Sequence, residues 1–199
     1  MAAPITSVFL APRAWPQRYI TADGKAIYFT AVRTAGATRD VYTSTWNGSA
    51  WSMPVRDDQL SSDTEDENDV AVSPDQLTAM IVRLATDGTR TLMIARRATK
   101  AERFAAPVAL PPIAFHTGAD PAAPSITNNG DAIYLHANSP GGGMRDLYYV
   151  KRIGDPLVYS TPAPLAQLNT TGRDSAPFIS GDETYLMFAR ANELYQTSR

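Results

Sequence analysis

The chain is patterned as short β-strands. In residues 27–32 and 133–138, neighbouring side chains alternate with the period of two expected of a strand whose two faces meet different surroundings. Asp23-Gly24 and Asn129-Gly130 precede these runs and tolerate the positive φ of a two-residue hairpin turn. Each run therefore predicts one arm of a β-hairpin.

This hairpin pattern returns four times along the chain. Its first marker, a Ser or Thr before polar turn residues and an apolar run, stands at Thr21, Ser73, Thr127 and Ser180, with spacings of 52, 54 and 53. A polar pair followed by an aliphatic residue and an aromatic residue or Met begins at Arg39, Arg90, Arg145 and Asn192. An aromatic-x-x-Pro marker begins at Phe9, Trp51, Phe104 and Tyr159. Three markers in register indicate tandem units of one supersecondary type.

Each unit contains four predicted strands, which is one blade of a β-propeller. We predict an all-β fold, a four-bladed β-propeller of four-stranded antiparallel blades, in a single domain of residues 1–199. The blades are expected at about 18–57, 69–110, 123–168 and 176–199 plus 5–13. The last unit stops before its aromatic-x-x-Pro strand and the N-terminus carries a spare one. The N-terminal strand is thus predicted to complete the last blade and close the ring. The alternative is a stretch cut from a longer array.

These motifs resemble the TolB-like, WD40-like β-propeller repeat family. The resemblance rests on Thr21-Ala22-Asp23-Gly24 and Ser73-Pro74-Asp75 before apolar strands, and on the Asp-aliphatic-Tyr segments within Arg39 to Tyr42 and Arg145 to Tyr148. It covers nearly the whole chain. It implies a binding or scaffolding module in an extracytoplasmic location, periplasmic or secreted, and it implies more than four blades in typical members.

Composition narrows the function classes. Hydrophobic residues make up 44% and charged residues 19%, with 15 Pro and 12 Gly, which is typical of a folded, turn-rich chain. The net charge of -2 supplies no basic field for a phosphate backbone, so nucleic acid is not expected as a partner. Without Cys there is no disulfide, Cys-based zinc site or thiol nucleophile. No apolar run suits membrane insertion, and residues 1–4 lack signal-peptide features.

Histidine and serine give little support for catalysis. His116 lies in a predicted loop and His136 in a predicted strand, and neither has the spacing of a metal-binding pair. A structural role is expected for both. No serine lies in a Gly-x-Ser-x-Gly elbow.

Three acids are the better candidates for a site. Glu67, Asp120 and Asp174 precede the hairpin Ser or Thr of their units by six, seven and six residues, and Trp15 takes the matching place in the first unit. Equivalent positions of successive blades converge near one mouth of the central channel. The predicted ligand-binding residues are therefore Trp15, Arg18, Glu67, Asp120 and Asp174.

The same acids form the predicted metal set, Glu67, Asp120 and Asp174. Carboxylates brought together repel one another unless a cation, or an arginine such as Arg18 or Arg173, compensates them. Calcium fits better than zinc because oxygen ligands are offered without Cys or paired His. The alternative is that these acids are solvated loop residues that cap turns.

Residues 57–69 hold seven of the 20 acidic residues. The segment lacks the Gly and the alternating ligand order of a calcium loop, so a solvated loop is the favoured interpretation.

The sequence thus predicts a noncatalytic binding or scaffold propeller that presents channel-mouth loops to a protein or glycan partner, with calcium as the cation if one is bound. The alternative is a carbohydrate-active enzyme of the glycosidase or lyase type that uses channel-mouth carboxylates. A monomer is expected, with a strand-swapped dimer as the alternative.

Overall fold

The computed structural model describes residues 18–32, 38–110, 115, 118–154, 157–191 and 193–198. The first sheet consists of β1 (Arg18–Ile20), β2 (Ala26–Val32), β3 (Arg39–Thr45) and β4 (Val55–Arg56). The second consists of β5 (Asp66–Val72), β6 (Thr78–Leu84), β7 (Arg90–Arg96) and β8 (Val108–Ala109).

The third sheet consists of β9 (Ala122–Ile126), β10 (Ala132–Asn138), β11 (Arg145–Gly154), β12 (Val158–Tyr159) and β13 (Ala163–Pro164), with the 3-10 turn η1 (Asn128–Gly130) between β9 and β10. The fourth consists of β14 (Asp174–Ile179), β15 (Tyr185–Arg190) and β16 (Glu193–Ser198). Within the described ranges, no helix is long and apolar enough to cross a membrane.

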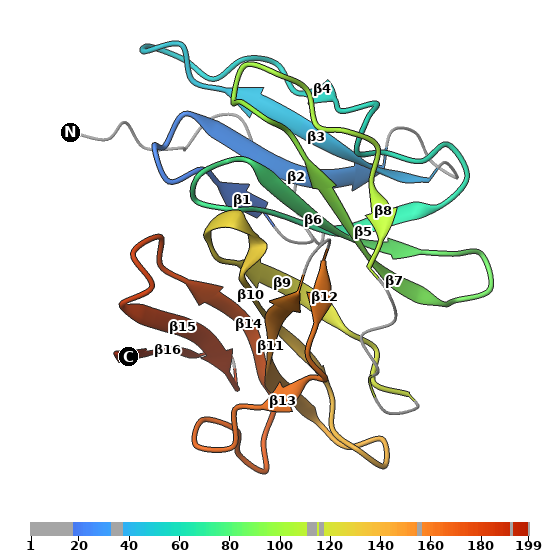
Figure 1. The fold of residues 1–199 in the computed structure, drawn as a ribbon, viewed down its shortest axis with the longest axis vertical. Helices are drawn as coiled ribbons and strands as arrows, with labels where there is room; N and C mark the ends of the chain where they lie inside the picture. Colours follow the sequence, from blue (N-terminus) through green and yellow to red (C-terminus); the bar gives the residue numbers. More distant parts are fainter. Residues whose placement is uncertain are drawn as a thin grey trace.

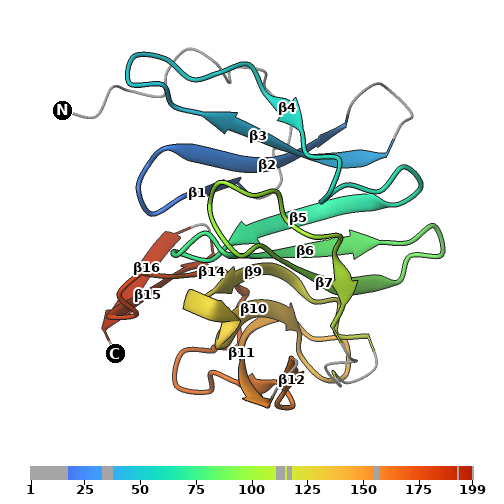
Figure 2. The ribbon, with the colours of Figure 1, turned by 45° about the horizontal axis from the view of Figure 1, so that its top comes forward.

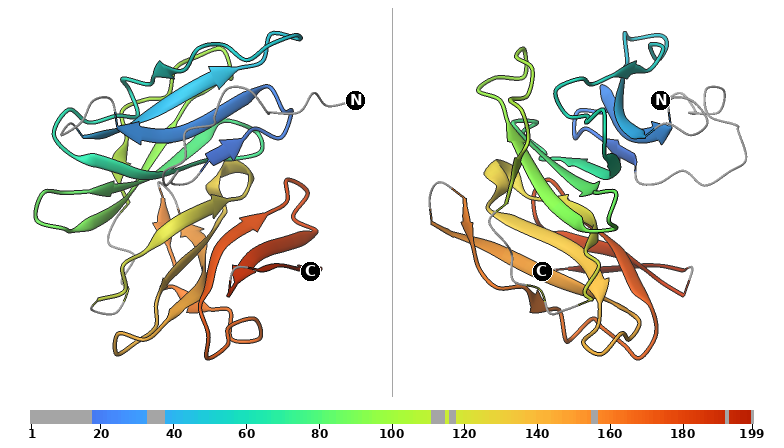
Figure 3. Two further views of the ribbon diagram at one scale, coloured as in Figure 1. Left: turned by 180° about the vertical axis from the view of Figure 1, so that it is seen from behind. Right: turned by 90° about the vertical axis from the view of Figure 1, so that its right-hand side faces the viewer.

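The sheets are the blades of a four-bladed β-propeller, as the sequence predicts (Figure 1). All strand pairs are antiparallel, and each blade begins with a hairpin whose first strand is the inner one. The inner strands follow one another, because β5 contacts β1, β9 contacts β5 and β14 contacts β9. Figures 2 and 3 show the four twisted sheets from other sides. Residues 5–13, the predicted closing strand, lie outside the described ranges.

The repeated Ser or Thr fixes each hairpin through its side chain. In the second blade, Ser73 Oγ accepts the N–H of Thr78 at 3.0 Å and donates to Asp75 at 2.5 Å. Thr21, Thr127 and Ser180 accept equivalent backbone N–H groups at 2.8 to 3.1 Å. A polar side chain that pairs with its own loop stabilises a turn without help from distant residues.

The predicted two-residue turns are wrong in length. The first hairpin has a five-residue loop, residues 21–25, closed by the Thr21 N–H donating to the Ala26 carbonyl at 2.9 Å. Gly24 does take positive φ, at 68°, as does Gly130 at 69° within the turn η1. The Ser/Thr side chain accounts for the longer loop because its oxygen accepts the backbone N–H at the far end of the loop, from Ala26 in the first hairpin and from Ala132 in the third.

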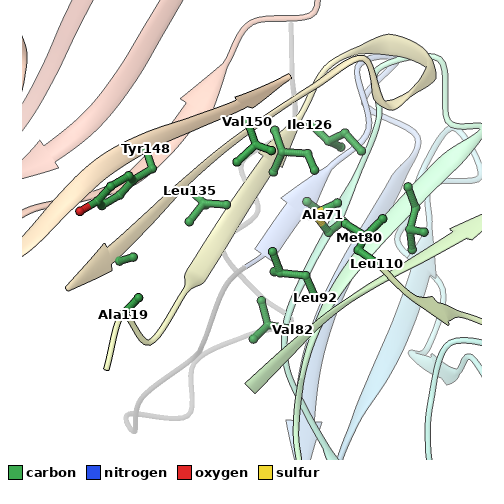
Figure 4. Close-up of a cluster of buried hydrophobic side chains, with 13 residues drawn as sticks. Ala71, Met80, Val82, Leu92, Leu110, Ala119, Ile126, Leu135, Tyr148 and Val150 are labelled. Atoms are coloured by element: carbon green, nitrogen blue, oxygen red, sulfur yellow. The ribbon is translucent and has the colours of Figure 1, made fainter. Parts of the chain in front are cut away.

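Apolar side chains fill the spaces between blades. The middle strand β6 sends Ala79 and Ile81 toward the first blade and Met80 and Val82 toward the third, as alternation along a strand requires. Figure 4 shows the cluster between the second and third blades. Small cores between successive sheets therefore replace one large core.

An aromatic side chain from the segment after the third strand closes two of these spaces. Phe104 is 3% exposed and meets Tyr28 edge-on, with ring centroids 6.4 Å apart, between the first two blades. Tyr159 packs on the cluster between the second and third blades and donates its hydroxyl to the Gly130 carbonyl at 2.7 Å.

A cavity of about 500 Å³ lies in the corresponding space between the third and fourth blades. Its lining includes Tyr134, which occupies the same place in its hairpin as Tyr28, together with Leu165, Leu168, Ile179 and Leu186. The described part of the fourth blade ends at β16, so no described residue fills this cavity as Phe104 and Tyr159 fill the other two spaces.

Candidate functional site

Glu67 is fully buried within β5. It lies opposite Arg83 of β6, whose Nε donates to Glu67 Oε1 at 2.9 Å, and both carboxylate oxygens accept the Ser62 N–H at 3.0 and 3.1 Å. Burial raises the pKa of Glu67 to about 7, although Ser62 and Arg83 act in the opposite direction. This carboxylate ties the linker between two blades to the inner strand.

Asp174 repeats the arrangement at the start of β14. It is fully buried opposite Arg190 of β15, whose Nε donates to Asp174 Oδ1 at 2.7 Å. Its other oxygen accepts the N–H and hydroxyl of Thr170 at 2.7 and 2.9 Å. In both blades the arginine follows the acid by 16 residues, a spacing that a hairpin turns into a cross-strand pair.

Asp120 differs from the other two acids. It precedes β9, its side chain is 38% exposed, and it accepts a hydrogen bond from Nε of Arg90, in the neighbouring blade, at 2.7 Å. This ion pair therefore joins the second blade to the third.

The predicted acids are held in three separate ion pairs. The compensating arginines are Arg83, Arg90 and Arg190, which the sequence analysis did not select. Trp15 lies outside the described ranges, and Arg18 begins β1 with a side chain that the structure does not describe. Among the residues that the structure does describe, no three His, Cys, Asp or Glu side chains are grouped as metal ligands.

The acidic segment 57–69 is less of a loop than the sequence suggests. Its last four residues form the start of β5. Asp57 accepts the N–H groups of Gln59 and Leu60, and Arg56 pairs with both Asp58 and Asp63 at 2.7 Å. Turn capping and local ion pairs thus account for much of its charge.

Irregular inner strands connect neighbouring blades. Ala123 and Ala176 have φ of 50° and 51° at breaks in the registers of β9 and β14. The freed Ala123 N–H donates to Asp69 Oδ2, and the Ala176 N–H donates to His136 Nδ1, both at 3.1 Å. A bulge exposes a backbone donor, and here a side chain of the preceding blade accepts it.

His136 is the buried centre of a region rich in arginine. It is 3% exposed, and burial lowers its pKa to about 3, with Arg145, Arg173 and Arg90 acting in the same direction. The imidazole is therefore neutral near pH 7. His136 lies in a strand, as the sequence predicts. Arg90 and Arg145 were not among the predicted site residues, although both open the second marker of their units.

The fold is shared with known propellers. A putative TolB from Agrobacterium tumefaciens matches with a TM-score of 0.59 and 15% identity, over 94% of this chain and 59% of that one. TolB from Acinetobacter baumannii matches with a TM-score of 0.60 and 12% identity, over 93% of this chain and 41% of that one. The chain has a TolB-like β-propeller fold.

Enzymes share this architecture as well. A periplasmic gluconolactonase from Pseudomonas aeruginosa matches with a TM-score of 0.53 and 17% identity, over 92% of this chain and 53% of that one. The chain spans less than two thirds of each of these three proteins. No family model and no curated protein matches the sequence. At these identities the likeness concerns the fold, because propellers carry many functions.

Proposed function

We propose that the chain is a noncatalytic binding or scaffold module that engages a protein or glycan partner at the end of the propeller where β7, β11 and β14 begin. The supporting observation is the gathering there of Arg90, Arg145 and Arg173 from three successive blades around His136. Charged side chains on a rigid scaffold recognise partners without moving the backbone. An extracytoplasmic location belongs to the same proposal and is supported by the likeness to a periplasmic protein.

Binding of the protein to peptide and glycan arrays tests this proposal. We expect at least one class to bind the unmodified chain and to lose binding when Arg90 and Arg145 are both replaced by Gln. The control is Arg103→Gln, which changes an exposed arginine in the segment between β7 and β8. If Arg103→Gln weakens binding as much as the double substitution does, the assignment to this end of the propeller is contradicted.

Calcium binding by Glu67, Asp120 and Asp174 remains a proposal. Each carboxylate is engaged by its own arginine, so an incoming cation has to compete with three ion pairs. Calorimetric titration with Ca²⁺ tests it. Heat of binding that disappears in Asp120→Asn supports the site, and a titration with no heat above dilution refutes it.

A carbohydrate-active enzyme is the second candidate, and one observation favours it. A carboxyl whose pKa is raised to about 7 suits general acid or base catalysis, and Glu67 has such a pKa. Its complete burial beside Arg83 argues for a structural role instead. Activity on a panel of glycosides that is abolished in Glu67→Gln while the fold persists would establish the enzyme. Turnover unchanged by this substitution would exclude Glu67 as its catalytic acid.

A further inference from the structure

Two arginines at this end of the propeller form no ion pair with an acid of the described residues. Arg145 is partly buried and Arg173 is exposed, and neither forms an ion pair with any residue in the described part of the chain. Arg90, Arg83 and Arg190, by contrast, each hold a carboxylate at 2.7 to 2.9 Å. Unpaired guanidinium groups that lie close together repel each other, which makes their meeting costly unless a ligand compensates them.

Strand register brings the two arginines to the same place. Arg145 lies opposite Asn138, and two residues further along, Leu147 lies opposite His136, so Arg145 and His136 belong to the same face of the sheet. Arg173 directly precedes β14, and Ala176 of that strand donates to His136 Nδ1 at 3.1 Å. Strand β14 also contacts both β10 and β11.

The imidazole between these strands is a hydrogen-bond donor. Since His136 is neutral and its Nδ1 accepts the Ala176 N–H, its proton resides on Nε2. This Nε2–H is buried and has no partner within the described residues. A buried donor left unpaired is destabilising, and such groups are commonly found where a ligand or an ordered water completes the bonding.

The neighbouring acids offset the arginines only in part. Asp120 and Asp69 attract Arg145, but burial, Arg173 and Arg90 act in the opposite direction and the pKa of Arg145 is lowered. Asp120 also pairs with Arg90 at 2.7 Å. Asp69 accepts the Ala123 N–H, and burial raises the pKa of this carboxyl. The local balance of charge around His136 is therefore positive, although the chain as a whole carries -2. Such a local field attracts anions and not cations.

We infer that Arg145 and Arg173, next to His136, form a binding site for a carboxylate group of an acidic peptide segment. The planar guanidinium groups match the two oxygens of a carboxylate, and the site lies where the strands β11 and β14 begin. The described neighbours of the two arginines in sequence and register are not aromatic, so they offer no flat platform of the kind typical of sugar binding; they are Met144, Asp146, Asn138, Gly172 and Asp174. The inference rests on the proposed binding function and names the chemistry of its partner.

Calorimetric titration with a hexaglutamate peptide at low ionic strength tests this site. We expect Arg145→Gln and Arg173→Gln each to weaken binding at least about tenfold, because each removes a charge-assisted hydrogen bond. Arg145→Lys is expected to bind more tightly than Arg145→Gln but less tightly than the unmodified protein, since an ammonium lacks the two parallel N–H donors of a guanidinium. The matched control is Arg152→Gln, which alters an arginine of the same strand that already pairs with Asp131.

The possible results separate the inference from the proposed function. No peptide binding, or an equal loss in Arg152→Gln, overturns the inference. If inorganic phosphate binds as tightly as the peptide, the site is not selective for carboxylate and that part of the inference is wrong. If polygalacturonate binds but the peptide does not, the carboxylate belongs to a sugar polymer and the inference of a peptide is wrong. A partner found on the arrays whose binding survives both Gln substitutions leaves the proposed function standing while the inference fails. Unchanged melting temperatures of the variants verify that their fold is intact.

Discussion

Glu67 and Asp174 share more than their place in the sequence pattern. Each is fully buried, lies opposite an arginine across a hairpin and accepts a backbone N–H from the linker that leads into its strand. Removal of one member of such a pair leaves a buried charge without compensation, which is more costly than the pair is stabilising. Glu67 and Asp174 thus have a structural task at the entry to the second and fourth blades.

His136 makes folding stability depend on pH. Its pKa is about 3 in the folded protein, below its ordinary 6.5, so the unfolded chain takes up a proton first as the pH falls. The stability is fully present above pH 6.5 and is lost progressively between pH 6.5 and 3. We expect His136→Gln to remove a pH-dependent contribution that reaches roughly 5 kcal/mol below pH 3. Urea unfolding at several pH values measures this, and parallel profiles for the two proteins would contradict it.

Substitution of Ser73 tests how much the hydrogen bonds of the repeated Ser or Thr side chain stabilise the hairpins. Ser73→Ala removes a buried hydroxyl that accepts the Thr78 N–H and donates to Asp75, so we expect a loss of about 1–2 kcal/mol in unfolding free energy. Ser49→Ala, in an exposed turn, is the control and should change stability by less than about 0.5 kcal/mol. Equal effects of the two substitutions in thermal denaturation would show that these hydrogen bonds are unimportant.

At the scale of elements, the interface between the third and fourth blades differs from the other two. Phe104 and Tyr159 fill the outer part of their interfaces, whereas a cavity of about 500 Å³ lies beside Tyr134. Along the last described strand, Leu194 is 73% exposed. The predicted closing strand, residues 5–13, carries Phe9 at the same place in its motif that Phe104 has in the second blade.

We therefore expect Phe9 to occupy this cavity. Phe9→Ala should lower the free energy of unfolding by about 3 kcal/mol, as should Phe104→Ala, because each substitution removes a buried ring. The control is Phe178→Ala, since Phe178 is 38% exposed. Chemical denaturation compares the three variants. A Phe9→Ala protein as stable as the unmodified one would contradict closure by the N-terminal strand.

At the scale of the molecule, the predicted N-terminal strand would make the same contacts whether it completes the last blade of its own chain or that of a second copy. Light scattering after size-exclusion chromatography distinguishes them, and we expect the mass of a monomer at all concentrations. A dimer that becomes monomeric when residues 1–13 are deleted would demonstrate strand exchange instead.

Local chemistry in the sequence determined the strands, the hairpins and the number of blades. Alternation with a period of two and a side-chain oxygen at each hairpin are properties of a few neighbouring residues, so they can be recognised without tertiary information. The cross-strand partners of Glu67 and Asp174 were also within reach, because a spacing of 16 residues recurs in both blades.

Only the tertiary structure decided which side chains meet across blades. The Asp120–Arg90 ion pair, the hydrogen bond from Ala176 to His136 and the cavity beside Tyr134 each depend on how two sheets pack and where a bulge shifts the register. A shift of one residue would turn each of these side chains to the other face of its sheet. Sequence periodicity fixes the faces of a strand, but the packing of neighbouring blades fixes what each face meets.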